Sequence, residues 1–117
     1  MAVDHSTLTI GGTRMKRTAM DATAGNAAVV TAPAWAQEVE VYFTDSGGTA
    51  EAGKIADSAT DGDAIGNDYF PVPSGQGYSY QLKADGESGQ VGNPTYALAG
   101  TSNAGYCHVA YKRGRLA

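Results

Sequence analysis

Three short segments of the chain alternate strictly between apolar or aromatic residues and polar ones. They span residues 38–44, 77–83 and 106–112. Successive side chains of a β-strand point to opposite faces, so a period of two gives each segment one apolar face and one polar face. The chain between them is rich in Gly, Ala, Ser, Asp and Asn, which favours turns over long helices. The pattern therefore predicts an antiparallel β-sheet protein.

Further strand signals lie at residues 13–20, 29–31, 54–56, 68–73 and 96–98. Seven or eight strands at intervals of roughly 8–15 residues are typical of a sandwich or barrel. Two prolines restrict residues 68–73 to a sheet edge, because Pro has no N–H to donate. A short helix within residues 50–66 is also compatible with the sequence. We expect an all-β fold, a small antiparallel β-sandwich or jelly-roll-like barrel of seven to eight strands with an extended N-terminal arm.

The length of 117 residues fits one domain. We expect an N-terminal arm or strap over residues 1–20 and a single β-sandwich domain over residues 21–117. Leu, Ile, Val and Phe make up only about 15% of the chain, so the seven Tyr residues must supply part of the core. Such a thin core suggests that oligomerisation or docking on a partner completes the stability of the fold.

The single cysteine and the lack of long apolar runs indicate in which compartment the protein folds. The lone Cys107 excludes an intrachain disulfide. The first residues lack the basic start and apolar stretch of a signal peptide, and no apolar run approaches the roughly 18–20 residues that span a membrane. We therefore expect a protein that folds in a reducing cytoplasm and has no membrane partner.

The adjacent pair Cys107-His108 is the natural place to look for catalysis, since Cys and His form nucleophilic dyads. Consecutive strand residues point to opposite faces, so these two side chains cannot hydrogen-bond to each other. Cys107 shares its face with Val109 and Tyr111, and we expect it to be a small buried residue. His108 is then a surface or interface residue, and His5 lies in the arm. No catalytic residue and no enzymatic activity are predicted.

Acidic residues cluster over residues 57–68. Calcium prefers six to eight oxygen ligands, and Asp61, Asp63 and Asp68 would be the first ligands to test. The order of residues in an EF-hand is absent, and no Glu stands at its closing position. Loops of this composition are usually solvated turns, so neither a metal nor a cofactor is predicted.

The basic residues are unevenly distributed. Six of the eight fall into two clusters: Arg14, Lys16 and Arg17, and Lys112, Arg113 and Arg115. In a strand over residues 13–20, Met15 and Arg17 would share one face, with Arg14 and Lys16 on the other. Where the first and last strands are neighbours, the domain has a basic pole and an acidic body.

The basic pole has three possible roles. The net charge of −4 and the pI of about 4.9 disfavour nucleic acid as its partner. The clusters are either ordinary solvated strand ends or a surface that docks on an acidic protein. In the second case, Tyr106 and His108 of the last strand join them in the interface.

The tyrosines leave a second alternative open. Tyr78, Tyr80, Tyr96, Tyr106 and Tyr111 would form a stacking platform if they shared an exposed sheet face, as in carbohydrate-binding modules. Tyr is also enriched at protein interfaces. Since aliphatic residues are few, we expect most of these rings in the core or in an interface.

Two runs carry a resemblance to a known group of proteins. They are Pro33–Phe43 and Phe70–Tyr78, followed by the Tyr-rich last strand. In composition and strand layout over roughly residues 30–112, the chain resembles the small β-sandwich structural proteins of tailed bacteriophage virions. It is similar in character to capsid decoration (cement) proteins and to the head domains of fibre proteins.

This resemblance implies a non-enzymatic protein of the virion, made in the host cytoplasm, that binds and braces the capsid surface. Its implied partners are the major capsid protein or other virion subunits, and it implies a homo-oligomer, with a trimer favoured. We expect residues 1–20 to embrace a neighbouring subunit or the capsid while the sandwich faces outward. The alternatives are a carbohydrate-binding or adhesin module and a tail or connector component.

Overall fold

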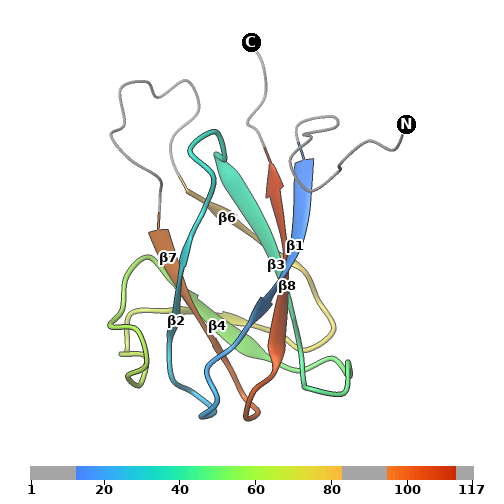
Figure 1. Ribbon diagram of the computed structural model, residues 1–117, viewed down its shortest axis with the longest axis vertical. Helices are drawn as coiled ribbons and strands as arrows, with labels where there is room; N and C mark the ends of the chain where they lie inside the picture. The colour runs from blue at the N-terminus through green and yellow to red at the C-terminus, as the bar shows by residue number, and fades with distance from the viewer. Residues whose placement is uncertain (1–12, 83–94, 113–117) are drawn as a thin grey trace, which may run out of the picture.

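The computed structural model describes residues 13–82 and 95–112, and in them the chain forms eight β-strands and no helix (Figure 1). The strands are β1 (Thr13–Ala19), β2 (Ala28–Thr31), β3 (Glu38–Thr44), β4 (Gly53–Ala56), β5 (Phe70–Val72), β6 (Tyr78–Gln81), β7 (Thr95–Gly100) and β8 (Tyr106–Lys112). The three alternating segments are strands β3, β6 and β8, as predicted. The short helix considered within residues 50–66 is not formed. Nothing helical in the described ranges is long or apolar enough to cross a bilayer.

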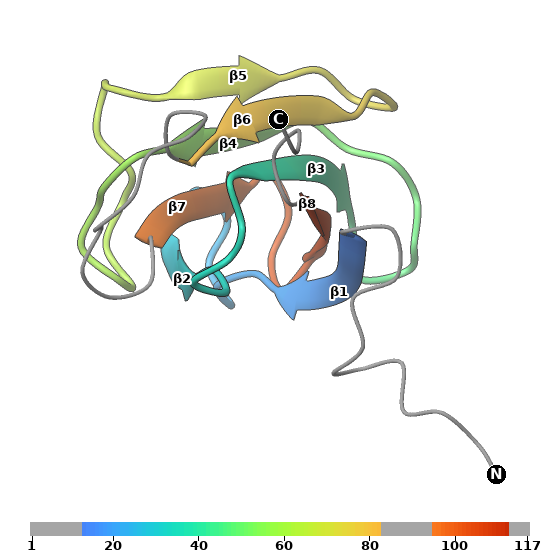
Figure 2. The same cartoon turned by 90° about the horizontal axis from the view of Figure 1, so that it is seen from above.

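The strands form two antiparallel four-stranded sheets, which confirms the predicted all-β sandwich. The first sheet has the order β1-β8-β3-β6, and the second has the order β2-β7-β4-β5. Figure 2 shows β5 and β6 together at one margin of the sandwich and β1 and β2 at the opposite margin. β5, which contains Pro71, is an edge strand as predicted. The first and last described strands are neighbours, since β1 pairs with β8 along its whole length.

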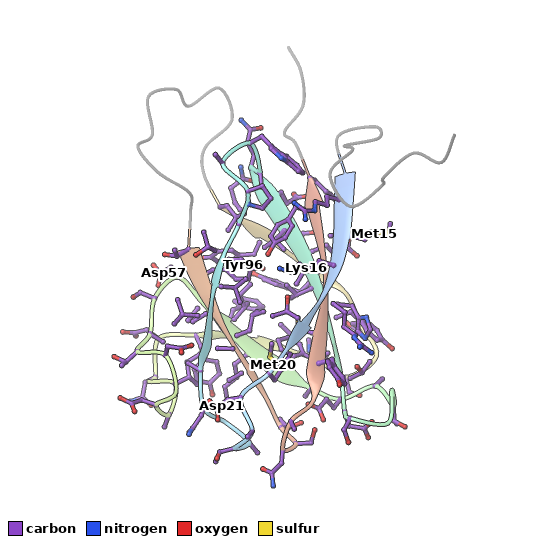
Figure 3. The ribbon with its side chains drawn as sticks, viewed as in Figure 1. Met15, Lys16, Met20, Asp21, Asp57 and Tyr96 are labelled. Atoms are coloured by element: carbon purple, nitrogen blue, oxygen red, sulfur yellow. The ribbon has the colours of Figure 1, made fainter. Side chains whose placement is uncertain are left out.

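The core lies between the sheets and depends on tyrosine, as the low aliphatic content predicts. Tyr96 and Tyr111 are almost fully buried, and their hydroxyl oxygens lie 2.8 Å apart in one hydrogen bond. Burial raises the pKa of both hydroxyls, so they remain neutral. Tyr96 lies between the sheets in Figure 3. Val39, Val41 and Phe43 of β3 face the same interior.

Most of the turn between β3 and β4 is built by one aspartate. The Oδ1 atom of Asp45 accepts hydrogen bonds from the backbone N–H groups of Gly47 and Thr49, each at 2.9 Å. Gly48 has a φ of 90°, a left-handed conformation that side chains disfavour. The Asp-Ser-Gly-Gly-Thr cluster is thus a turn, as its composition predicts.

The outer face of the second sheet is covered by the chain itself, and we call it the covered face. Ala27, Ala56 and Ala97 on this face are buried, and Ala59 and Ile65 of the loop over residues 57–68 pack against them. Alanine side chains let the loop lie close to the sheet, because they add little height. We call residues 57–68 the covering loop.

Part of the predicted arm is a strand of the first sheet. Residues 13–19 of the expected arm are β1, an integral strand of the first sheet. Strand formation follows from the alternation of this segment, which gives β8 a regular partner over seven residue pairs. Residues 1–12, the other part of the predicted arm, lie outside the described residues.

Candidate functional site

The outer face of the first sheet carries a mixture of apolar, aromatic and charged side chains, and we call it the open face. Residues opposite each other on neighbouring strands share a face. The register thus places the following side chains together: Met15 and Arg17 of β1, Tyr106, His108, Ala110 and Lys112 of β8, Glu38, Glu40 and Tyr42 of β3, and Ser79 and Gln81 of β6. All of them are exposed or half-buried.

A depression of about 690 Å³ lies at the middle of the open face. Ala110 forms its floor, because its small side chain stands between Met15 on β1 and Glu40 on β3. Tyr42 and His108 line it at the side. Met15 is 81% exposed, which is the largest exposed fraction among the large apolar residues found outside the core. An exposed thioether beside aromatic rings is typical of an adaptable protein-binding surface.

The charges around the depression are partly paired. The Nζ atom of Lys112 lies 2.7 Å from Oε1 of Glu40 and 3.9 Å from Oε2 of Glu38. The hydrogen bond to Glu40 raises the pKa of Lys112 above its usual value. Arg17 stacks its guanidinium 4.2 Å from the ring centre of Tyr106. The ammonium of Lys112 thus has two carboxylate partners, whereas the guanidinium of Arg17 has none among the described residues.

His108 is held on the open face, on the side of β8 opposite the thiol of Cys107. Its Nε2 atom lies 3.0 Å from Oγ1 of Thr44, and its ring meets the edge of Tyr42 with centroids 6.4 Å apart. Cys107 points to the opposite face, is fully buried, and has its pKa raised to about 12 by burial. The predicted separation of Cys107 from His108 is therefore confirmed, and the two do not form a dyad.

The structure brings together the predicted interface residues that it describes, but on two faces. Arg17, Tyr106, His108 and Lys112 lie on the open face. Arg14 and Lys16 point to the inner side of β1, as the alternation predicts; Met15 and Lys16 lie on opposite sides of the strand in Figure 3. Arg113 and Arg115 lie outside the described residues.

Several residues of the open face were not predicted to belong to an interface, among them four that line the depression: Met15, Glu40, Tyr42 and Ala110. The alternation of their strands places each of them on a polar face. It does not say which strands are neighbours. Only the pairing of β8 with both β1 and β3 makes Ala110 the floor of a depression.

Two of the three acidic candidates, Asp61 and Asp63, accept hydrogen bonds that join the covering loop to β2 and the residue before it. The Oδ1 atom of Asp61 accepts a hydrogen bond from the backbone N–H of Val29 at 2.8 Å. The backbone carbonyl of Asp63 accepts another from Ala27 at 2.7 Å. Asp63 and Asp68 line a depression of about 380 Å³. Within residues 13–82 and 95–112, no group of three His, Cys, Asp or Glu side chains is placed to hold a metal ion.

The tyrosines do not form one exposed row in the described part of the chain. Tyr96 and Tyr111 are in the core. Tyr78 stacks on Phe70 across the margin of the sandwich, with ring centroids 4.5 Å apart. Tyr106 lies against Arg17. The expectation that these rings serve the core is confirmed for Tyr96 and Tyr111.

Comparison of the chain with protein-family models, with curated proteins and with solved structures found no match.

Proposed function

We propose that the chain is a non-enzymatic structural protein of a phage particle that binds and stabilises the capsid surface through protein–protein contacts. The observation that carries the proposal is the open face, where exposed Met15 stands beside a depression of about 690 Å³. Met15, Arg17, Tyr42 and Tyr106 on this face belong to residue types that are enriched at interfaces. A depression on an exposed sheet face can receive a side chain of another protein.

The composition of the core supports the same proposal. The interior is filled by few aliphatic side chains and by a buried tyrosine pair. Association with other subunits adds buried area that such a domain lacks. The proposed partners are the major capsid protein or other virion subunits, and the proposed assembly is a homo-oligomer, with a trimer favoured. The proposed location is the virion, after synthesis in the host cytoplasm.

Co-sedimentation with purified phage particles, followed by mass spectrometry of the pellet, tests the proposal. Ala110→Arg fills the floor of the depression with a long charged side chain, and we expect it to weaken association by about tenfold or more. Ser79→Arg is the matched control, because it adds the same side chain to the open face outside the depression. Equal binding by both variants, or absence of the wild-type chain from particles, would contradict the proposal.

A carbohydrate-binding or adhesin module is the alternative with an observation of its own. Tyr69 and Phe70 are 38% and 51% exposed at the other margin of the sandwich. One face of Phe70 is covered by Tyr78, and Lys54 lies 4.5 Å from the ring centre of Tyr69. A glycan array probed with the wild type and with Phe70→Ala decides this point. Glycan binding that Phe70→Ala abolishes would favour the alternative.

A further inference from the structure

Among the strands that the structure describes, four lie at sheet edges, and they differ in how they are protected. An edge strand exposes backbone N–H and C=O groups that can pair with another chain. β5 has three residues, among them Pro71, and β6 has four. The start of β2 is covered by the covering loop, through the bridge between Asn26 and Ala64 and the bond from Val29 to Asp61. β1 has seven residues, without Pro or Gly, and no described segment pairs with its outer side.

The direction of the backbone groups of β1 follows from its ladder with β8. Just beyond the strand, the N–H of Met20 donates to the carbonyl of Gly105 at 2.9 Å, in the same register. Along an antiparallel strand, the backbone N–H and C=O groups of successive residues point alternately to one neighbour and to the other. The groups of Lys16 and Thr18, at even spacing from Met20, therefore point toward β8. Those of Met15 and Arg17 point toward the free edge. β1 therefore offers a regular set of donors and acceptors to a further strand.

Positive charge lies on both sides of this edge. Arg14 and Lys16 line a recess of about 200 Å³ between β1 and the end of β2, which we call the basic recess. Arg17 is on the open face. In the described residues, the two salt bridges belong to Lys112, and none involves a cation of β1. The three cations are thus available to carboxylates from outside.

We propose that the free edge of β1 binds an extended, acidic segment of another protein by strand addition. The backbone of the added strand pairs with Met15 and Arg17, and its carboxylates on the inner side enter the basic recess. Its side chains on the other side lie next to Met15, at the border of the depression. This inference rests on the proposed protein-binding function and names the chemistry of the partner segment, an alternation of acidic and apolar residues.

A second copy of this chain fits the edge poorly. Pairing of β1 with β1 of another copy would place Arg14, Lys16 and Arg17 beside the same cations, and like charges across a ladder destabilise it. The short edge strands β5 and β6 of another copy contain no acidic residue that could pair with these cations. Nucleic acid has no backbone that continues a β-ladder, and the net charge of −4 repels it.

A rival explanation is that the charges protect the edge, since inward-pointing cations prevent unwanted strand pairing in many proteins. The two explanations differ once a charge is removed. Lys16→Thr should weaken the binding of an acidic segment if the edge is a binding site. It should instead make the protein self-associate if the charge is protective.

The test uses the full chain and a fluorescent seven-residue peptide, Thr-Glu-Val-Glu-Val-Glu-Thr, measured by anisotropy. We expect saturable binding that weakens in about 1 M salt, where charges are screened within ~3 Å. The peptide Thr-Lys-Val-Lys-Val-Lys-Thr should bind at least about tenfold more weakly. Two modified acidic peptides test the backbone hydrogen bonds: one has N-methylated valines and the other has N-methylated glutamates. One of the two should lose binding, because its methyl groups replace the N–H groups that pair with β1.

Two variants separate the backbone from the side chains. Met15→Pro removes an N–H that faces the free edge and leaves the bonds to β8, so it should abolish binding while the melting temperature changes little. Met15→Ala keeps that N–H and should bind within about threefold of the wild type. Lys16→Glu should lose the acidic peptide and gain the lysine peptide, a gain that a misfolded variant cannot show.

The outcomes are distinct. Equal binding of both N-methylated peptides, equal binding by Met15→Pro, or no binding of the acidic peptide would overturn strand addition. Tighter binding of a single-stranded oligonucleotide than of the acidic peptide would also overturn it, in favour of nucleic acid. Self-association of Lys16→Thr without loss of peptide binding would assign the charge a protective role. Particle association that survives alongside a failed peptide test would leave the proposed function standing and remove only this inference.

Discussion

The two outer faces of the sandwich differ in what covers them. On the second sheet, Ala27, Ala56 and Ala97 are buried under Ala59 and Ile65 of the covering loop. On the first sheet, the small residue Ala110 is flanked by exposed Met15 and has a depression above it. Alanine thus serves two purposes in one chain. On the covered face it makes room for the protein's own loop, and on the open face it leaves room for something else.

The edges at one margin of the sandwich show the same difference. At β2, the carboxylate of Asp61 takes the place of a neighbouring strand for the N–H of Val29. At β1, the corresponding groups of Met15 and Arg17 meet no described segment. At this margin the chain itself covers the outer face of the second sheet and the start of β2, so the open face and the edge of β1 are the regions where we expect a partner.

The largest difference in the free energy of unfolding is expected when one alanine on the covered face and one on the open face are each replaced by leucine. Ala97→Leu adds volume where the side chain is fully buried, so the covering loop must move, and we expect a loss of about 1–3 kcal/mol in the free energy of unfolding. Ala110→Leu, on the open face, should change it by less than about 0.5 kcal/mol. Urea unfolding measures both. Similar losses in the two variants would show that the open face is packed as tightly as the covered one.

A smaller effect is expected at the protected edge. Asp61→Ala removes the acceptor for the N–H of Val29, which should cost about 1 kcal/mol and speed hydrogen exchange at Val29. Asp63→Ala is the matched control, because Asp63 contributes its backbone carbonyl to Ala27, which the substitution keeps. An unchanged exchange rate at Val29 in Asp61→Ala would disprove the role assigned to this carboxylate.

The smallest effect is expected for the ion pair on the open face. The side chains of Lys112 and Glu40 are 35% and 44% exposed, so screening limits the pair, and Lys112→Gln should cost about 0.5 kcal/mol at neutral pH. The pKa of Lys112 is raised in the folded state, so its contribution is complete below the unfolded value of 10.5. It is lost as the pH rises through the folded pKa. A difference between wild type and variant that grows above pH 10.5 would contradict the assignment.

The sequence predicted the strands better than their neighbours. Alternation was sufficient for β3, for the separation of Cys107 from His108, and for the two-sided placement of Arg14 and Arg17, because all three depend only on the period of the strand. The floor of the depression depends on which strands flank β8, and that choice is made by packing of the whole sandwich. The loop of Asp61 has the composition of a solvated turn, so nothing local indicates that it closes the edge of β2.

The place of residues 13–19 in the sheet could not be predicted for a related reason. The Gly-Gly break at residues 11–12 lies within the predicted arm, but the segment after it was grouped with the segment before it. Alternation predicted a strand over residues 13–20, but it did not indicate which strand of the sandwich this segment would pair with. The segment pairs with β8 at the edge of the first sheet. A strand with several charged residues is tolerated at this position, because its side chains reach water.

Oxidative footprinting of the chain alone and bound to particles tests most directly that the open face is the binding surface. Met15 is 81% exposed and readily oxidised by hydroxyl radicals, whereas Met20 is 7% exposed and serves as a buried reference; both are labelled in Figure 3. We predict that particle binding lowers the oxidation of Met15 at least about fivefold, by removing its contact with water. Phe70, 51% exposed at the other margin, should be oxidised as before. Unchanged oxidation of Met15 with protection of Phe70 would contradict the account and move the binding surface to the opposite margin.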